Sequence, residues 1–267
     1  MIAFYNTFIF QPMYNGLIFL IDILPWADAG VAIIVFTLII KLILFPLSKK
    51  AVYTQLKMKK VEPQLRAIKE KYSGKDQAQE QAKQTMAFYK REGIRPFAGI
   101  LLIFIQLPIL FALYKAFLHP GLPNIDVTLL YSFVIAPMSE SINMHFLGLF
   151  DIAGKSIALA LIAAVSTYFQ VRFSMPPLPP KKATSFDKDG KPIRPNFQED
   201  FARGMNIQMR YVFPVIAFFI SWSISGAIAL YWITSNLFTI AQELVIRKSF
   251  ARNESRAEAK KNLNPAV

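Results

Sequence analysis

Polar side chains are rare inside the long apolar runs of this sequence, and they are the residues most able to do chemistry there. One of them is a cation, Lys41, within the run from Gly30 to Lys50. A lysine in hydrocarbon costs about 2.5–3.5 kcal/mol on insertion scales, which makes it a functional-site hypothesis. The alternative is that its long side chain reaches the membrane surface, because Pro46 is expected to end or bend the helix five residues later. Spacing alone leaves both readings open.

The other polar residues inside the apolar runs are uncharged. They are Thr37, Gln106, Ser166, Gln170, Thr234, Ser235 and Asn236. Each alone is typical of a hydrogen bond between neighbouring helices. Together with Lys41 they predict a polar groove with a cationic centre, which would bind acidic or polar peptide segments.

The residue types needed for most catalysis are missing from these runs. The sequence has no cysteine, and its two histidines, His119 and His145, lie outside the expected spans. Glu243 is the nearest carboxylate to a span interior, and it lies near the end of the last span. The sequence therefore predicts no metal site, no cofactor and no enzymatic activity, since neither a zinc pair nor a catalytic dyad or triad can be formed.

Five apolar runs are expected to place these polar residues in a membrane. The chain has 267 residues, of which 54% are hydrophobic, and a bilayer crossing needs about 20 apolar residues. The uncharged run from Tyr211 to Gln242 is too long for one ~30 Å crossing, so we divide it at Ser223–Gly226. The expected spans are 30–48, 96–117, 152–171, 211–224 and 227–246.

The remaining segments differ from the spans in polarity and charge. They are an interfacial amphipathic segment at 1–29, a helical hairpin at 49–95, a loop at 118–151, a proline-rich loop at 172–210 and a basic, disordered tail at 247–267. The distribution of Lys and Arg orients them: 27 of the 30 lie in 49–95, 172–210 and 247–267. The positive-inside rule places these three segments in the cytoplasm and the N-terminus outside. This excess orients the chain without any need for DNA binding.

Three stretches, in this order and with five spans, resemble the YidC/Oxa/Alb family of membrane protein insertases. They are KLILFPLSKKAVYTQLKMKKVEPQL at 41–65, FYKREGIRPFAGILLIFIQLPILFALY at 88–114 and LYWITSNLFTIAQELVIRK at 230–248. The resemblance implies an all-α, multi-pass protein of the bacterial plasma membrane, with a cytoplasmic hairpin and a hydrophilic groove. It implies that spans three and five contact substrate. Lys41 matches the position where the family usually has arginine, so the charge is kept but the planar donor fork is lost.

The sequence as a whole predicts an insertase and chaperone that needs no cofactor. Its expected partners are nascent membrane proteins and the lipid bilayer, with the Sec translocon and the ribosome as further candidates. A small transporter or channel is one alternative, although no acidic proton relay or internal repeat supports it. A membrane assembly scaffold without insertion activity is the other.

Overall fold

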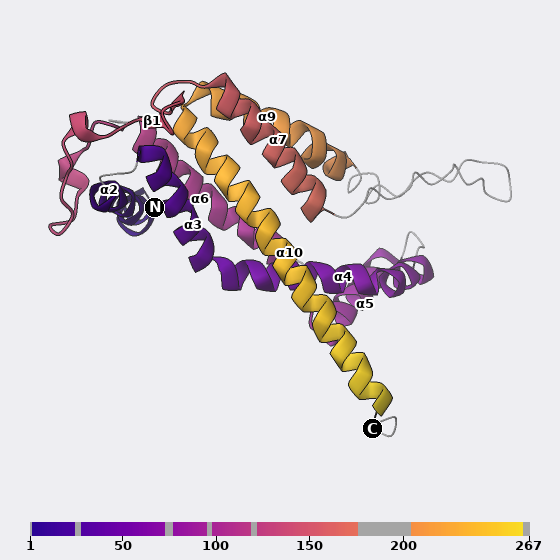
Figure 1. Cartoon of the computed structure of the whole chain (residues 1–267). Coiled ribbons are helices and arrows are strands. Elements are labelled where there is room, and N and C mark those ends of the chain that lie inside the picture. Colours follow the sequence, from indigo (N-terminus) through magenta and orange to yellow (C-terminus); the bar gives the residue numbers. More distant parts are fainter. Residues whose placement is uncertain are drawn as a thin grey trace, which may run out of the picture. The chain divides into compact units, whose positions relative to one another are not determined.

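The computed structural model describes residues 2–24, 28–72, 77–94, 98–118, 122–175 and 204–263, and it is mostly helical (Figure 1). The chain divides into two compact units, which are described one at a time. The first unit comprises Met1–Ile39 and Phe111–Ile240, and the second comprises Ile40–Leu110 and Ala241–Val267. The expected proline-rich loop at 172–210 falls mostly in 176–203, which lies outside the described residues.

The helices follow the apolar and amphipathic runs of the sequence. They are α1 (Ile2–Tyr5), α2 (Gln11–Ile23), α3 (Ala29–Ile43), α4 (Phe45–Lys71), α5 (Ala78–Arg91), α6 (Ala98–Leu118), α7 (Ile157–Ser174), α9 (Phe213–Ser223) and α10 (Gly226–Leu263). The shorter elements are the π-helical turns η1 (Asn6–Phe10) and η5 (Gln208–Val212), the 3-10 turns η3 (Val127–Leu129) and η4 (Ser139–Ser141), and the strands β1 (His145–Phe146) and β2 (Phe150–Asp151).

Length and apolar composition alone qualify one described helix as a membrane span, α7, with a mean hydropathy of 1.5. A second candidate is the pair formed by α3 and the first part of α4, which are bent by 60° where they meet. Pro46 lies in the first turn of α4, where the N–H that proline lacks would have no partner within the helix. The bend therefore lies next to the proline from which the sequence predicted it. The residues of the expected span 30–48 lie on α3 and the start of α4, and that they cross a membrane stays a prediction.

One part of the core of the first unit is formed by α7, α9 and the N-terminal part of α10. Figure 1 shows α7 and α9 side by side, and they are in contact along their length. Ala160 and Ala163 of α7 and Ala227 and Ala229 of α10 are fully buried. Small residues at these positions allow helix backbones to approach closely, as is usual between membrane helices. The break between α9 and α10 at Ile224 and Ser225 falls where the sequence predicted a chain reversal.

The N-terminal segment is helical and is held by the loop at 118–151. The side-chain amide of Asn15 donates to the carbonyl of Leu129 at 2.9 Å, and its oxygen accepts the N–H of Tyr131 at 2.6 Å. The hydroxyl of Tyr14 accepts the N–H of Asp126 at 2.8 Å. The loop is therefore ordered here by groups on α2, because buried backbone donors and acceptors need partners.

A short β-hairpin in the same loop lies against the start of α3. Strands β1 and β2 pair antiparallel, and Leu147 and Gly148 form the turn with φ of 53° and 69°. The connection between the paired residues Phe146 and Phe150 has three residues, and hairpins with three-residue loops commonly place a residue in the left-handed region. The carboxylate of Asp28 accepts the N–H of Val31 and the N–H of Leu147, both at 2.9 Å. Asp28 therefore caps α3 and fixes the hairpin turn at the same time.

The residues after this hairpin hold the start of α10. The N–H of Gly226 donates to the carbonyl of Gly154 at 2.8 Å, and the N–H of Ala227 donates to the carbonyl of Ile152 at 3.0 Å. A Cβ at residue 226 would lie 3.0 Å from the Cα of Ile152, so glycine is needed for this close approach. The first turn of α10 thus has protein partners for donors that a helix N-terminus leaves unpaired.

In the second unit, α4 and α5 pack against each other, as expected for a helical hairpin. The tail behaves differently from the expectation. Residues 247–263, which we expected to be disordered, continue α10 without a break. This part of α10 contacts α4: the rings of Tyr53 and Phe250 meet edge to face with centroids 5.2 Å apart. The disorder prediction is wrong because it counted the charges of the tail and missed a partner almost 200 residues away.

Candidate functional site

The candidate polar residues of the first unit include a hydrogen-bonded cluster between α7 and α10. The amide nitrogen of Asn236 donates to the hydroxyl of Ser166 at 3.0 Å and to the hydroxyl of Thr167 at 2.8 Å. Both hydroxyls donate in turn to the carbonyl of Ala163, at 2.8 Å and 2.7 Å. The hydroxyl protons are thereby used within α7, and the oxygen lone pairs are left to accept the two N–H bonds of Asn236.

This cluster is buried. Ser166 and Asn236 expose 7% and 8% of their surface, and Thr167 exposes 1%. In this cluster Ser166 and Asn236 form a hydrogen bond between two helices, which was one of the two interpretations of these residues from the sequence. The sequence interpretation gave Thr167 no place in the candidate site. The signal for it was its position next to Ser166, because consecutive hydroxyl residues on α7 can both reach one amide on a neighbouring helix.

Two other candidate residues of the first unit are also buried. Thr37 is fully buried and donates its hydroxyl to the carbonyl of Ile33 on its own helix at 2.7 Å. Ser235 exposes 4%, and its carbonyl accepts the hydroxyl of Thr239 at 2.7 Å. A bond to a carbonyl four residues back thus satisfies the hydroxyls of Thr37 and Thr239.

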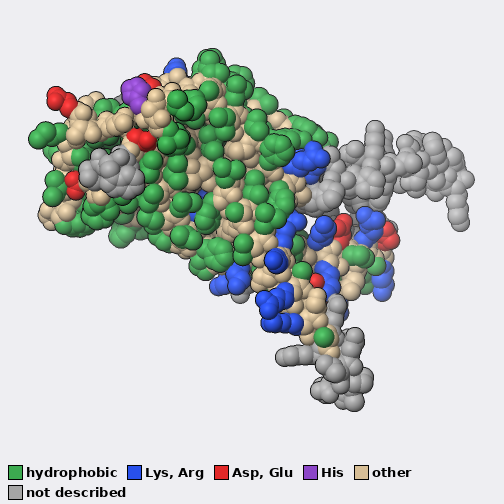
Figure 2. Space-filling model, in the orientation of Figure 1, with side chains coloured by type: hydrophobic (Ala, Val, Ile, Leu, Met, Phe, Trp, Pro, Cys, Tyr) green, Lys and Arg blue, Asp and Glu red, His purple; other side chains and the backbone are tan. Residues whose placement is uncertain are grey.

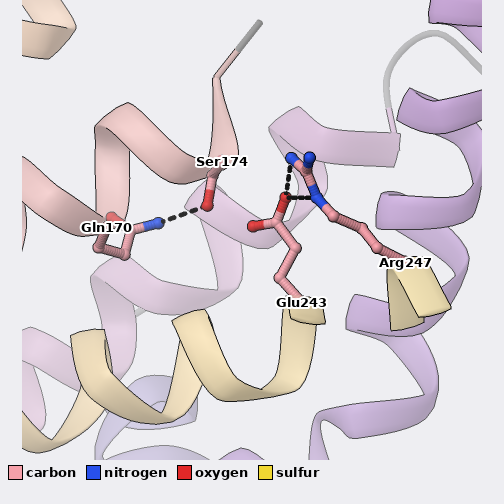
Figure 3. Close-up of polar contacts among 4 residues, drawn as sticks. All are labelled: Gln170, Ser174, Glu243 and Arg247. Carbon is pink, nitrogen blue, oxygen red and sulfur yellow. Dashed lines mark hydrogen bonds and ion pairs between the residues drawn. The ribbon is translucent and has the colours of Figure 1, made fainter. Parts of the chain in front are cut away.

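Gln170 is half-buried near the C-terminal end of α7. Its side-chain amide donates to the hydroxyl of Ser174 at 3.1 Å, one helical turn further on (Figure 3). The side chains of Gln170 and Ser174 therefore lie on the same face of α7. Among the candidates of the first unit, Gln170 is the one whose side chain keeps appreciable exposure.

The second unit contains Lys41 and Gln106, and both side chains are half-buried. Lys41 lies in the last turn of α3, three residues before the bend at Leu44. Its neighbours Leu42 and Ile43 expose 60% and 69% of their surface. A cation in the last turn is also favoured by the partial negative charge of a helix C-terminus.

An ion pair between a buried carboxylate and a half-exposed guanidinium lies on α10 in the second unit. Arg247 donates through Nε at 3.0 Å and through a terminal nitrogen at 2.6 Å, both to Oε1 of Glu243 (Figure 3). The Glu243 side chain exposes only 3%, so its charge needs this partner. The sequence interpretation noted Glu243 but missed the pair. Its signal was the i,i+4 spacing of an acid followed by a base, the favourable order on a helix.

A third polar cluster joins α4 to the C-terminal part of α10. The hydroxyl of Tyr53 lies 3.1 Å from that of Ser249 and accepts the amide of Asn253 at 3.3 Å. Lys60 pairs with Glu254 at 2.7 Å. The sequence interpretation missed this cluster too. The buried side chain of Ile246 is followed at helical spacing by residues 249, 250 and 253, and this stripe was the signal.

No group of three or more metal-ligating side chains occurs within the described ranges. The three polar clusters described above consist of amides, hydroxyls and ion pairs. Side chains of these kinds can form hydrogen bonds with peptide groups and can attract groups of opposite charge.

The sequence model of the 60Kd inner membrane protein family matches residues 21–254. The chain belongs to this family. The matched range includes most of both units and all three polar clusters. Members that resemble this chain include "Membrane protein insertase YidC" of Oceanobacillus iheyensis, 28% identical over 82% of this chain and 74% of the relative. "Membrane protein insertase YidC 2" of Bacillus anthracis is 30% identical over 83% of this chain and 72% of the relative. "Membrane protein insertase MisCA" of Bacillus subtilis is 27% identical over 91% and 79%.

Proposed function

We propose that this chain is a membrane protein insertase of the bacterial cell membrane. The observation that carries this function is the family match over residues 21–254, together with relatives that are named insertases and align with most of this chain. The sequence supports it because no residue constellation for a covalent reaction lies in the apolar runs. Insertion needs binding and release and no covalent step.

The chain crosses the membrane five times in this proposal, with the N-terminus outside and α10 ending in the cytoplasm. The charge distribution supports this orientation, because Lys and Arg concentrate in α4, α5 and the last turns of α10. The helical hairpin of α4 and α5 then lies in the cytoplasm, where it meets substrates before they enter the membrane. The same basic surfaces are candidate contacts for the ribosome and the Sec translocon.

Lys41 is the residue that attracts the substrate in this proposal. It carries a positive charge at the end of an apolar helix and is only half-buried, so acidic residues of a translocated segment can approach it. Gln106 and Gln170, which are half-buried as well, contact polar parts of substrates. Thr37, Ser166, Ser235 and Asn236 have a supporting role, because their buried side chains fix helices and leave little surface for a substrate.

The test is insertion by the purified protein in liposomes. The substrate is a short single-span protein with an acidic translocated tail, and protease protection of the tail measures insertion. Wild type is expected to insert it, and Lys41→Ala to insert it about fivefold less efficiently, since two charges 4 Å apart in water attract by about 1 kcal/mol. Lys41→Arg keeps the charge and should restore insertion.

Lys248→Ala is the matched control, because Lys248 is an exposed cation of the second unit beyond the apolar part of α10. It should insert like wild type. Equal insertion by wild type and Lys41→Ala, for acidic and neutral tails alike, would leave the insertase function intact and remove the role of Lys41. Failure of every variant, with native unfolding behaviour, would favour a channel, tested by ion flux in the same liposomes, or a non-inserting scaffold.

A further inference from the structure

The first unit has an apolar groove on its surface between α7 and α9. The groove has a volume of about 550 Å³, and its walls include Leu161, Val165 and Phe169 from α7 and Val215, Phe218 and Phe219 from α9. Hydrophobic side chains cover the surface over these two helices (Figure 2). From Leu161 to Phe169 the groove follows eight residues of α7, about 12 Å at 1.5 Å per residue. Its volume is in the range of specific small-molecule sites, about 300–1,000 Å³.

Beyond one end of this apolar groove lie a phenol hydroxyl and an arginine. Tyr168 lines the groove, and its hydroxyl accepts a hydrogen bond from the guanidinium of Arg172 at 2.8 Å. The ring of Tyr211 lies 6.3 Å from that of Tyr168, centroid to centroid. Arg172 is exposed and follows Tyr168 by four residues, so it extends the same helix face beyond the groove. The bond to Tyr168 uses one of the five N–H donors of a guanidinium and fixes its position.

The charged residues of α7 and of residues 204–223 are both arginines, and these two segments contain no Asp or Glu. Arg172 follows Tyr168 by four residues, and Arg210 directly precedes Tyr211 in the sequence. At the other end of α9, Trp222 stacks on Phe218 and exposes 39% of its surface. Aromatic residues of this kind gather at both membrane–water interfaces. In the proposed topology, α7 ends at the cytoplasmic side, so we place Arg172 at the depth of the lipid headgroups.

These observations select an occupant with one apolar chain and one negative group at its end. In a membrane the apolar lining alone gives no preference for one occupant over the surrounding lipid, because lipid tails are as apolar as leucine. A guanidinium with two phenols next to it is suited to a phosphate, which it binds through charge and several hydrogen bonds. A second helix docked in the groove would use its whole length and would gain nothing specific from Arg172.

We propose that this groove binds one anionic phospholipid, with an acyl chain between α7 and α9 and the phosphate on Arg172 and the Tyr168 hydroxyl. The proposal rests on the membrane location of the protein and not on its insertase activity. Lipid binding and insertion are measured separately, so either can fail without the other.

The test is native mass spectrometry of the full-length protein in detergent, titrated with phosphatidylglycerol or with phosphatidylcholine at equal concentration. Wild type should retain one phosphatidylglycerol about fivefold more strongly than phosphatidylcholine, the preference expected for one arginine at a membrane surface. Arg172→Gln should lose this preference and bind both lipids alike. Lys155→Gln, which removes an exposed cation near the other end of α7, should keep it.

A second pair of variants tests the groove itself. Ala164→Phe places a ring among the lining residues and should reduce retention of both lipids, whereas Ala158→Phe adds the same ring at an exposed position of α7 outside the groove and should bind like wild type. Equal retention of the two lipids by wild type, or unchanged binding in Arg172→Gln and Ala164→Phe, would overturn the proposal. A dimer that Ala164→Phe abolishes would also overturn it, since the groove would then join two copies of the chain.

Discussion

Asn236 on α10 donates its side-chain amide to the hydroxyl of Thr167 on α7 at 2.8 Å, and no charged group takes part. Together with the bond to Ser166, this contact joins two helices that the chain separates by about 70 residues. Its polar atoms are satisfied inside the helix interface, so the cluster gives α7 and α10 a fixed register relative to each other in the first unit.

Asn236→Leu should destabilise the protein by about 1–2 kcal/mol, because hydrogen bonds between membrane helices contribute about 0.6 kcal/mol on average and up to about 1.7 kcal/mol each. Thermal unfolding in detergent measures the loss. Ser223→Ala is the control, since Ser223 is exposed and bonds only to the carbonyl of Phe219 on its own helix. If Asn236→Leu unfolded at the temperature of wild type, the cluster would not hold the helices.

Tyr53→Phe should loosen the contact between α4 and the C-terminal part of α10. The variant keeps the ring contact with Phe250 but removes the hydroxyl bonded to Ser249 and Asn253. Hydrogen–deuterium exchange of residues 247–263 should become faster, and faster still in Tyr53→Ala. Tyr72→Phe, at the far end of α4, should leave that exchange unchanged. Wild-type exchange in Tyr53→Ala would show that α10 is helical there without help from α4.

Arg247→Ala should be more harmful than the double variant Arg247→Ala/Glu243→Gln. Removal of the arginine takes the ion-pair partner from a carboxylate whose side chain is only 3% exposed. The cost should be less than the ~3–5 kcal/mol of a fully buried pair, because the Arg247 side chain is 36% exposed. The neutral glutamine removes the charge and with it most of this cost. Unfolding midpoints of the two single variants and the double variant form the cycle. Additive effects would mean that the two side chains act independently.

Gly30→Ala should destabilise the start of α3, because a Cβ there would clash with the ring of Phe146 in the β-hairpin. Overpacking of this kind costs about 1–3 kcal/mol. Phe146→Ala in the same chain should restore part of the loss by making room. Gly204→Ala serves as control, since a Cβ at that glycine meets no atom within 4 Å. A Gly30→Ala protein as stable as wild type would show that the hairpin moves aside easily.

Local sequence signals predicted the features that depend on nearby residues. Pro46 predicted the bend between α3 and α4, and Ser225 and Gly226 predicted the break before α10, because backbone chemistry at those positions decides both. Helical spacing likewise predicted α4 and α5. The five crossings and the groove cation at Lys41 stay predictions from charge and hydropathy.

Features that depend on distant residues could not be predicted in this way. The tail was expected to be disordered because its own composition is basic and polar, but Tyr53 gives it a partner on another helix. Similarly, the sequence alone does not decide whether Ser166 and Asn236 line a groove or form hydrogen bonds between helices. Only their 7% and 8% exposure shows that they are packed between helices.

The contacts that hold the start of α10 also set an order of events during synthesis. Gly154 and Ile152 accept the first N–H groups of α10, whereas Leu147 is already available to Asp28 once the β-hairpin has been made. At about 5–20 residues per second, the 72 residues between Gly154 and Gly226 take about 4–14 s to follow. During that interval the β-hairpin is already bound to α3, whereas the carbonyls of Ile152 and Gly154 still lack their partners on α10. A protein proposed to insert other chains thus passes through a state in which its own final helix is still to be inserted.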